Sequence, residues 1–343
     1  MTVIPAPDPG PATPRAVAVY IVTYRRHEML RRSIESVLRQ THRNLTLQVV
    51  NDDPEDHAVE EIVASFADDR AAMYRPIRKR GATANFNLVY QQTEADFSAL
   101  LEDDNWWEPR FLESQIETMA QHPTAPVVVG NERVWKENPD GSWTDTGQTI
   151  WPFGDVRLHS ATLASLCGSA VICNSSMLIR TDRSRTLLTP DTIPVDVTEH
   201  FRERLLPAEI PLNGAPLVNY AETLATARDS EKLWGQYQIV LIGSVFAALA
   251  HAQRRKLAQG LWREVTSASS PRAMTLIFAG IAVAEARELV RQAPILSLPR
   301  AAMALARRPH RIKMLRQAPR ALRKQFQFLK NAPLVQELAG DTQ

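Results

Sequence analysis

Hydrophobic and polar positions alternate in blocks along the first third of the chain. Residues 16–22 form a continuous apolar run, which is typical of a strand buried on both faces of a sheet. Over residues 29–40 the apolar positions mostly fall three or four apart, which predicts an amphipathic helix. Strand and helix patterns then alternate over residues 45–50, 59–66, 72–74, 86–89 and 97–101. This alternation predicts an α/β fold built on an open, mostly parallel sheet flanked by helices.

The middle and the end of the chain follow other patterns. Short apolar runs predict strands at residues 127–129, 133–135 and 171–179. The sequence Asn-Pro-Asp-Gly at residues 138–141 is a strong turn signal and predicts a hairpin. From residue 231 onward Ala, Leu and Arg dominate, which predicts a helical extension at the C-terminal end.

Polar residues follow three of the predicted strands at the point where each strand ends. They are residues 23–24 (Thr-Tyr), Asp52, and the acidic triplet at residues 102–104 (Glu-Asp-Asp). In open parallel sheets, ligands bind beyond the carboxyl ends of the strands. Three adjacent carboxylates repel one another unless a positive group lies among them, and such hard oxygen ligands suit Mg²⁺ or Mn²⁺. The alternative interpretation of the triplet is a solvated acidic turn.

Composition sets few further limits. The chain has 343 residues, of which 44% are hydrophobic and 23% charged, enough for one large domain with an appendage or for two domains. Residues 1–15 lack the apolar core of a signal peptide and are interpreted as a disordered leader. The most apolar segment, residues 239–250, is shorter than the about 20 residues that a membrane span needs. The two cysteines, Cys167 and Cys173, fit no zinc or redox motif, so we interpret them as small buried hydrophobes in a cytoplasmic protein.

Several motifs, in order along the chain, resemble the family 2 glycosyltransferases, which have the GT-A nucleotide-sugar fold. Residues 19–26 are similar to that family's opening strand and its Thr-Tyr-Asn-Arg turn, and residues 33–41 are similar to its first helix. Residues 49–52 resemble the end of its second strand. Gly81 with Asn87 resembles the next loop, and residues 101–109 resemble the metal-binding Asp-x-Asp region with the helix that follows.

The resemblance covers about residues 16–225 and implies a domain organisation. A GT-A catalytic domain would span residues 16–230, with a nucleotide-binding half at 16–110 and an acceptor half at 111–230. A helical, basic region would occupy residues 231–343. The chain departs from the usual family residues at three positions, namely Val22 (usually Pro), Asn51 (often Asp) and Phe86 (often Arg).

The resemblance also implies a donor site. Asp52 would hydrogen-bond the nucleobase, and Thr23 and Tyr24 would form the pocket around it. A carboxylate can accept an imide N–H such as that of uracil, and an aromatic ring can stack on a base. The alternatives are a helix N-cap for Asp52, just ahead of Pro54, and core packing for Tyr24. The remaining nucleotide-sugar-binding residues implied are Arg26, Gly81, Asn87 and Asp103, the last of them near the ribose hydroxyls.

Asp104, with Glu102 as its Asp-x-Asp partner, is implied to hold a divalent cation, Mn²⁺ or Mg²⁺, against the donor's diphosphate. The cation would stabilise the negative charge that develops on the leaving diphosphate. Glu102 is one methylene longer than the usual Asp, so its carboxylate reaches further. Trp106 and Trp107 come next, and at least one of them is predicted to lie in the core because a helix follows immediately.

An inverting transfer needs a general base for the acceptor hydroxyl. Two alignments with the family compete for its position. Counting back from residues 216–218 places the base on Asp196, with an apolar helix stripe at Val197, Phe201 and Leu205. Matching the family's local Glu-Asp motif instead selects Glu199 and His200, with His200 in place of the Asp. The first alignment is narrowly favoured; the alternatives are an N-cap for Asp196 and a helix-surface position for His200.

Residues 300–330 carry many Arg and Lys residues and no acids, with apolar positions at near-helical spacing. A basic amphipathic helix is typical of binding to an anionic membrane surface. A solvated helical appendage packed on the catalytic domain explains the pattern equally well. Nucleic acid is not an expected partner, because no base-reading module accompanies the charge.

Together these observations predict a metal-assisted, inverting glycosyltransferase. Its donor would be a nucleoside-diphosphate sugar, most simply a UDP-sugar, and its acceptor a hydroxyl of a glycan or lipid-linked glycan. The expected location is cytoplasmic, with peripheral binding to the inner face of the membrane. One alternative is a nucleotidyltransferase, although residues 23–26 lack the Gly-rich phosphate loop of that class. The other is a catalytically decayed nucleotide- or carbohydrate-binding scaffold.

Overall fold

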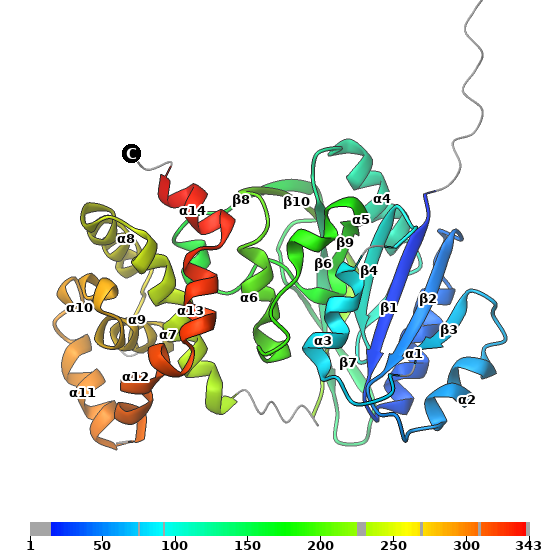
Figure 1. The fold of residues 1–343 in the computed structure, drawn as a ribbon, viewed down its shortest axis with the longest axis horizontal. Coiled ribbons are helices and arrows are strands. Elements are labelled where there is room, and N and C mark those ends of the chain that lie inside the picture. The colour runs from blue at the N-terminus through cyan, green and yellow to red at the C-terminus, as the bar shows by residue number, and fades with distance from the viewer. Residues whose placement is uncertain are drawn as a thin grey trace, which may run out of the picture.

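The computed structural model describes residues 15–74, 76–91, 93–224, 231–267, 270–307 and 310–340. All of the predicted disordered leader except Arg15 lies outside these ranges. Within them, the strands form one ten-stranded sheet in the order β3-β2-β1-β4-β9-β6-β10-β5, with β7 paired to β6 and β8 to β10. Helices flank the sheet, and a group of C-terminal helices lies beside it (Figure 1).

The first half of the sheet is parallel, as predicted. β1 (Val17–Thr23) lies between β2 (Leu45–Asn51) and β4 (Phe97–Glu102), and β3 (Ala71–Tyr74) pairs with the outer side of β2. Their register places the last residue of β1 opposite the last residue of β2, and on its other side the end of β1 lies next to the end of β4. The polar residues at the three strand ends therefore meet at one edge of the sheet.

Helices cover both faces of this parallel half. α1 (His27–Leu38) buries its apolar stripe, which begins with Leu30 and Ile34, in the same cluster as the inward residues of β1. α2 (Ala58–Ser65) joins that cluster. The other face is covered by α3 (Ala82–Phe86) and a 3₁₀ turn at Asn87–Tyr90, so the helix predicted through residues 86–89 is split in two.

The second half of the sheet is mixed, which the sequence pattern did not predict. β9 (Met177–Arg180) runs antiparallel to both β4 and β6 (Val127–Glu137), while β10 (Glu209–Glu222) runs parallel to β6. β5 (Trp106–Trp107) closes the order antiparallel to β10. The two strands predicted at residues 127–129 and 133–135 are one continuous strand. Most of the strand predicted at residues 171–179 is irregular, since its polar residues at 174–176 form a 3₁₀ turn.

The predicted hairpin is present. β6 and β7 (Trp143–Thr149) pair antiparallel, and Gly141 in the turn has a φ of 81°, which favours glycine. β8 (Val156–Ser160) pairs with the start of β10. The other helices of this region are α4 (Phe111–Gln121), α5 (Thr181–Ser184) and α6 (Thr198–Glu203).

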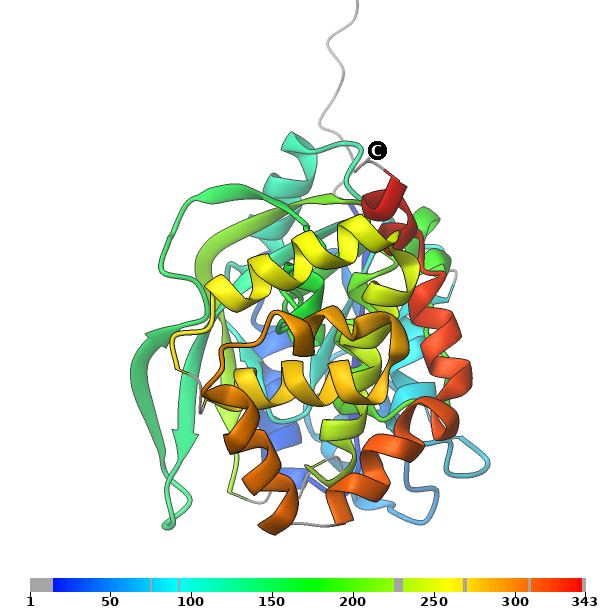
Figure 2. The same ribbon diagram turned by 90° about the vertical axis from the view of Figure 1, so that its left-hand side faces the viewer.

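The C-terminal region is helical, as predicted. Figure 2 shows its helices stacked beside the sheet. They are α7 (Glu231–Ala248), α8 (His251–Arg263), α9 (Pro271–Ala282), α10 (Glu288–Arg291), α11 (Ser297–Arg307), α12 (His310–Ala321), α13 (Arg323–Lys330) and α14 (Pro333–Gly340). They share an apolar cluster that also takes in Leu166 and Cys167 from the loop before β9. Within the described ranges, none of these helices combines the length and apolarity needed to cross a bilayer.

A buried arginine joins the helical region to the sheet. Arg204, just after α6, donates hydrogen bonds to the carbonyl oxygens of His200 (2.6 Å), Leu166 (2.5 Å) and Leu241 (3.4 Å). Its own carbonyl oxygen accepts from the N–H of Leu334 in α14 (3.2 Å). Four segments far apart in the sequence are thus connected through one side chain and its backbone, and α6 is held against α7.

Candidate active site

The polar strand ends open on a cavity of about 530 Å³. Among the described residues, its lining holds seven carboxylates and a single guanidinium, that of Arg26. The seven acidic residues are Asp52, Glu102, Asp103, Asp104, Glu132, Asp196 and Glu199. Such an excess of like charge in one cavity is costly unless protons or cations reduce it.

The backbone of the acidic turn after β4 is held by α1. The hydroxyl of Ser33 lies within hydrogen-bond distance of the carbonyl oxygens of Asp103 (2.9 Å) and Asn105 (2.6 Å). Arg32 donates to the carbonyl oxygen of Asp104 (2.6 Å). The side chain of Asn105 donates to the hydroxyl of Ser175 (2.8 Å). The carboxylates of Asp103 and Asp104 therefore project from a rigid backbone.

Arg26 bridges these two carboxylates. Its Nη1 lies 2.8 Å from Oδ2 of Asp104 and 3.2 Å from Oδ1 of Asp103. Burial alone would lower the pKa of Arg26, but the two neighbouring carboxylates outweigh it, so the pKa is raised. Burial raises the pKa of Asp103 to about 6, and the charge of Arg26 opposes that rise. The predicted metal ligand Asp104 thus already has a cationic partner from its own chain.

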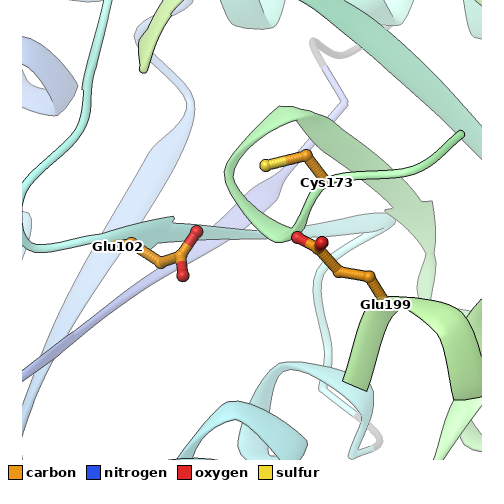
Figure 3. Close-up of side chains that lie close together, drawn as sticks. All are labelled: Glu102, Cys173 and Glu199. Carbon is orange, nitrogen blue, oxygen red and sulfur yellow. The ribbon is translucent and has the colours of Figure 1, made fainter. Parts of the chain in front are cut away.

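A second acidic group lies around Glu102 and Glu199 (Figure 3). Figure 3 shows their carboxyl groups pointing toward one another, with the thiol of Cys173 beside them, and the ligand atoms of all three lie within 4.8 Å of one another. Glu102 accepts a hydrogen bond from the hydroxyl of Ser175 (2.9 Å), and Glu199 accepts one from the N–H of Asn174 (2.9 Å). Burial, with the charges of Asp104 and Glu199, raises the pKa of Glu102 well above its ordinary value. Carboxylate oxygens at this separation fit a divalent cation.

The sequence interpretation missed Glu132. It lies in β6, its side chain is 4% exposed, and it lines the cavity. Burial raises its pKa to about 7, although the thiol of Cys173 partly opposes the shift by hydrogen bonding. The available signal was an acid between the two segments predicted as strands, residues 127–129 and 133–135, where burial of a charge is costly.

The two cysteines differ in their surroundings. Cys167 is buried in the apolar cluster of the C-terminal helices, as predicted. Cys173 instead faces the cavity among three glutamates, so its interpretation as a simple buried hydrophobe is wrong. Burial, together with the charges of Glu132 and Glu199, raises the pKa of the Cys173 thiol well above its ordinary value. A thiol that keeps its proton is a poor nucleophile.

The three candidate base residues have different positions. Asp196 is exposed on a 3₁₀ turn at Val195–Val197 and lines the cavity, and Glu199 in α6 lines it as well. His200 is buried, and within the described chain it is not among the lining residues. Burial, reinforced by Arg204, lowers the pKa of His200 to about 4. The predicted apolar stripe of α6 is present, since Val197 and Phe201 are buried.

Asp52 supports the loop before α3. Its carboxylate accepts hydrogen bonds from the backbone N–H groups of Arg80 (2.8 Å) and Gly81 (3.1 Å). Since α2 begins at Ala58, Asp52 is not its N-cap. Gly81 has a φ of 89°, in the region that favours glycine, and it lets the chain turn sharply into α3. Asp52 also lines the cavity, so this loop and the cavity wall are coupled.

Tyr24 lies at the mouth of the cavity rather than in the core. Its side chain is 41% exposed, and Nζ of Lys79 lies 3.7 Å from the ring centroid. Thr23 beside it is buried. An exposed aromatic face with a cation nearby can stack on a flat, electron-rich ligand.

The side chain of Asn87 is hydrogen-bonded to other residues of the chain and does not face the cavity. Its side-chain amide donates to the carbonyl oxygen of Thr189 (2.7 Å) and to Oδ1 of Asp191 (2.6 Å), and its Oδ1 accepts from Arg202 (3.4 Å). In the described chain it does not belong to the cavity lining. The structure therefore does not bring Asn87 together with the other predicted donor residues.

One of the two tryptophans after the acidic turn lies in the core, as predicted. Trp107 is buried and packs on Phe111 with ring centroids 4.4 Å apart. Trp106 lies in a surface group with Trp135 and Trp143, and the guanidinium of Arg32 lies 3.8 Å from the Trp106 ring centroid. Burial lowers the pKa of Arg32 to about 10. This packing holds Arg32 where it binds the acidic turn.

Comparison with known proteins agrees with this architecture. Residues 18–180 match the family model described as Glycosyl transferase family 2. The UDP-Glc:alpha-D-GlcNAc-diphosphoundecaprenol beta-1,3-glucosyltransferase WfgD of Escherichia coli is 28% identical over 178 residues, which is 52% of this chain and 64% of that protein. An uncharacterized protein of Mycobacterium tuberculosis is 22% identical over 216 residues, which is 62% of this chain and 58% of that protein. The chain therefore spans less than two thirds of the length of these curated relatives.

Among solved structures, S. aureus TarS 1-349 in complex with UDP superposes with a TM-score of 0.54 at 14% identity, covering 96% of this chain and 92% of that one. The fold is accordingly of the GT-A type, as predicted. The family model thus matches residues 18–180, most of the range over which the sequence motifs resemble family 2 glycosyltransferases.

The raised pKa of Glu132 makes stability depend on pH. The folded protein holds a proton on Glu132 up to about pH 7, whereas the unfolded chain releases it near 4.5, so stabilisation present at low pH is lost as the pH rises between these values. Replacing Glu132 by Gln removes this loss. We expect E132Q to gain about 2–3 kcal/mol relative to the parent between pH 5 and pH 8, measured by urea unfolding. The exposed control variant E117Q should show the same dependence of unfolding free energy on pH as the parent. If E132Q also shows the parent's pH dependence, the raised pKa of Glu132 is contradicted.

Proposed function

We propose that the protein is an inverting glycosyltransferase that moves a sugar from a nucleoside-diphosphate sugar, a UDP-sugar, to a hydroxyl of a glycan or lipid-linked glycan. The observation that carries the proposal is the gathering of seven carboxylates around one cavity at the carboxyl ends of the parallel strands, in a family 2 domain. An anionic donor enters such a cavity only if a cation comes with it. A nucleoside diphosphate with a divalent cation meets that requirement.

The donor half has groups suited to a nucleotide. The ring of Tyr24 is partly exposed and can stack on a base, and Asp52 and Thr23, joined by a backbone hydrogen bond, line the same cavity. Arg26 and Asp103 follow along the wall, within reach of a ribose and its phosphates. TarS has been solved with UDP and with UDP-GlcNAc, and the E. coli relative carries UDP-Glc in its name. These names support a uridine nucleotide as the first donor to test.

Asp104 and Glu102 are proposed to hold the cation. The donor set consists of hard carboxylate oxygens. Burial first, and then the negative charges of Asp104 and Glu199, raise the pKa of Glu102, and a cation would offset that charge. A bound Mn²⁺ or Mg²⁺ would supply Lewis-acid stabilisation of the leaving diphosphate. The chain's own contribution is to keep the turn rigid, through α1, and to keep the cavity enclosed.

A donor screen tests this function. The full chain is incubated with UDP-, GDP- and dTDP-sugars, with and without Mn²⁺, and nucleoside-diphosphate release is measured. We expect release from a UDP-sugar that requires the metal, and we expect D104N to slow it about 100-fold, because the leaving charge loses its counter-ion. D145N, on the exposed hairpin, should match the parent. A chain that binds UDP but releases it from no sugar would instead be a decayed scaffold.

Asp196 is the proposed general base. It lies at the exposed rim of the cavity, where an acceptor from solvent can reach it. Glu199 lies deeper, hydrogen-bonded beside Glu102, which suits a role in positioning the transferred sugar. His200, buried with its pKa lowered to about 4, is the weakest of the three candidates at neutral pH.

If Asp196 is the general base, its loss should slow the chemical step and leave donor binding nearly unchanged. We expect D196N to lower kcat about 100- to 10,000-fold while the donor KM stays within a few-fold, because the acceptor hydroxyl loses the carboxylate that takes its proton. H200N should retain most of the activity. If E199Q loses kcat and D196N does not, the base is Glu199.

A membrane-proximal acceptor is supported by the surface of the helical region. One group of exposed apolar side chains lies in α11 and just before it, where Ile295 is 85% and Leu296 67% exposed, with Leu298 and Met303 also exposed. Arg300 and Arg307 lie among them, and α11 lies at the end of the molecule toward which the parallel strands run (Figures 1 and 2). Apolar side chains framed by arginines are complementary to an anionic bilayer surface.

Among the described residues, only part of the basic segment at residues 300–330 has apolar side chains that could contact a membrane. Of its apolar positions, Leu315 and Leu329 are buried in helical clusters, whereas Met303 and Ile312 are exposed. Peripheral binding through α11, rather than through all of residues 300–330, is therefore proposed. The E. coli relative is named for a diphosphoundecaprenol-linked acceptor, which is a lipid carrier.

Vesicle sedimentation tests this surface. We expect the parent to co-sediment with vesicles containing phosphatidylglycerol and the double variant Ile295→Asn, Leu296→Asn to do so about tenfold less, because two inserted side chains are lost. Leu158→Asn is the matched control, since Leu158 is 51% exposed but lies in β8, in the sheet. Equal loss in both variants, or binding to neutral vesicles alone, would contradict the proposal.

A further inference from the structure

Arg26 occupies a position that a metal-bound diphosphate needs. One nitrogen of its guanidinium is shared between Asp104 and Asp103, at 2.8 Å and 3.2 Å. Asp104 is the proposed cation ligand, and a guanidinium and a divalent cation on one carboxylate repel each other. Resting on the proposed function, we propose that Arg26 is an internal counter-ion that holds the acidic turn in the donor-free protein, gives up Asp104 to the entering cation and turns to the donor's diphosphate.

The exchange must take place in the side chains, because the turn itself cannot move away. Its backbone carbonyl oxygens are held by Ser33 and by Arg32, and Asn105 ties its end to Ser175. Arg32 is in turn packed against Trp106 and cannot follow. Arg26 is the mobile partner, since it lies just before α1 and its side chain is 38% exposed. A half-exposed guanidinium can leave an ion pair without being stranded in a dry interior.

The charges favour the exchange only when both ligands are present. Without a donor, moving Arg26 away leaves Asp103 and Asp104 to the cation but gives the guanidinium no new anion. With a diphosphate in the cavity, the planar fork of Arg26 gains phosphate oxygens, for which its geometry is well suited. The cation and the nucleotide should therefore bind cooperatively, and the same coupling must appear whichever of them is added first.

The test measures Mn²⁺ binding to the full-length, donor-free protein by electron paramagnetic resonance. We expect Arg26→Gln to bind Mn²⁺ about tenfold more tightly than the parent, because the competing cation is gone, and to bind UDP in the presence of Mn²⁺ about tenfold more weakly. A residue that only contacts the donor would leave the Mn²⁺ affinity unchanged, and a purely structural residue would lower it. The sign of the change therefore discriminates between these roles.

Arg25→Gln is the matched control. Arg25 is the neighbouring arginine, but its partner is Asp53, at 2.5 Å, and it is not a lining residue in the described chain. Its variant should match the parent in Mn²⁺ affinity. In an Asp104→Asn background, Arg26→Gln should no longer change Mn²⁺ affinity, because the contested carboxylate is absent. Arg26→Met also removes the charge and keeps a long side chain, so it replaces the glutamine variant if that variant folds poorly.

Unchanged or weaker Mn²⁺ binding in folded Arg26→Gln, or in Arg26→Met if only that variant folds, would overturn the inference. These titrations need no sugar, so they separate the inference from the proposed function. If the protein transfers sugar but Arg26→Gln leaves the Mn²⁺ affinity unaltered, the counter-ion role is rejected and the proposed function stands. Tighter Mn²⁺ binding in a protein that transfers no sugar supports the counter-ion role and removes the proposed reaction.

Discussion

The repulsion among carboxylates at the strand ends is the constraint around which this structure is arranged. Asp103 and Asp104 share a single arginine, while Glu102 and Glu132 sit at positions where burial raises their pKa. Each of these acids costs folding free energy when it is ionised in a partly dry cavity. A protein that keeps such a set, with protons and one guanidinium as its counter-charges, is suited to accept a cationic or cation-bound ligand.

The rest of the domain holds that arrangement in place. α1 binds the acidic turn through Ser33 and Arg32, and the loop at residues 173–176 contributes Ser175, which contacts both Glu102 and Asn105. β9 follows that loop directly and lies next to β4, so the loop crosses the strand end. The acids are therefore clamped between a helix on one side and a loop on the other. Rigid positioning of charged groups is what lets a site act on charge that develops during a reaction.

The helical region is bound to this site through α6. Glu199 faces the cavity from α6, whereas Phe201 and the carbonyl oxygen of His200 face α7 and Arg204. A short helix thus serves as the cavity wall on one side and as the joint to the C-terminal helices on the other.

The parallel half of the sheet, the hairpin and the helical end could be predicted from the sequence, because they depend on local periodicity and turn residues. The sequence also located Thr23, Asp52 and residues 102–104 together, since the carboxyl ends of parallel strands must share an edge. It could not find Glu132, Cys173 or the role of Arg26. Glu132 reaches the site only because β9 pairs with both β4 and β6 and so brings β6 within one strand of β4, and Cys173 only because its loop crosses the end of β4. Asn87, selected by resemblance, makes its hydrogen bonds to Thr189 and Asp191 instead. Long-range pairing decided these contacts, because which side chains share a cavity depends on strand order and loop path, which local residue patterns do not encode.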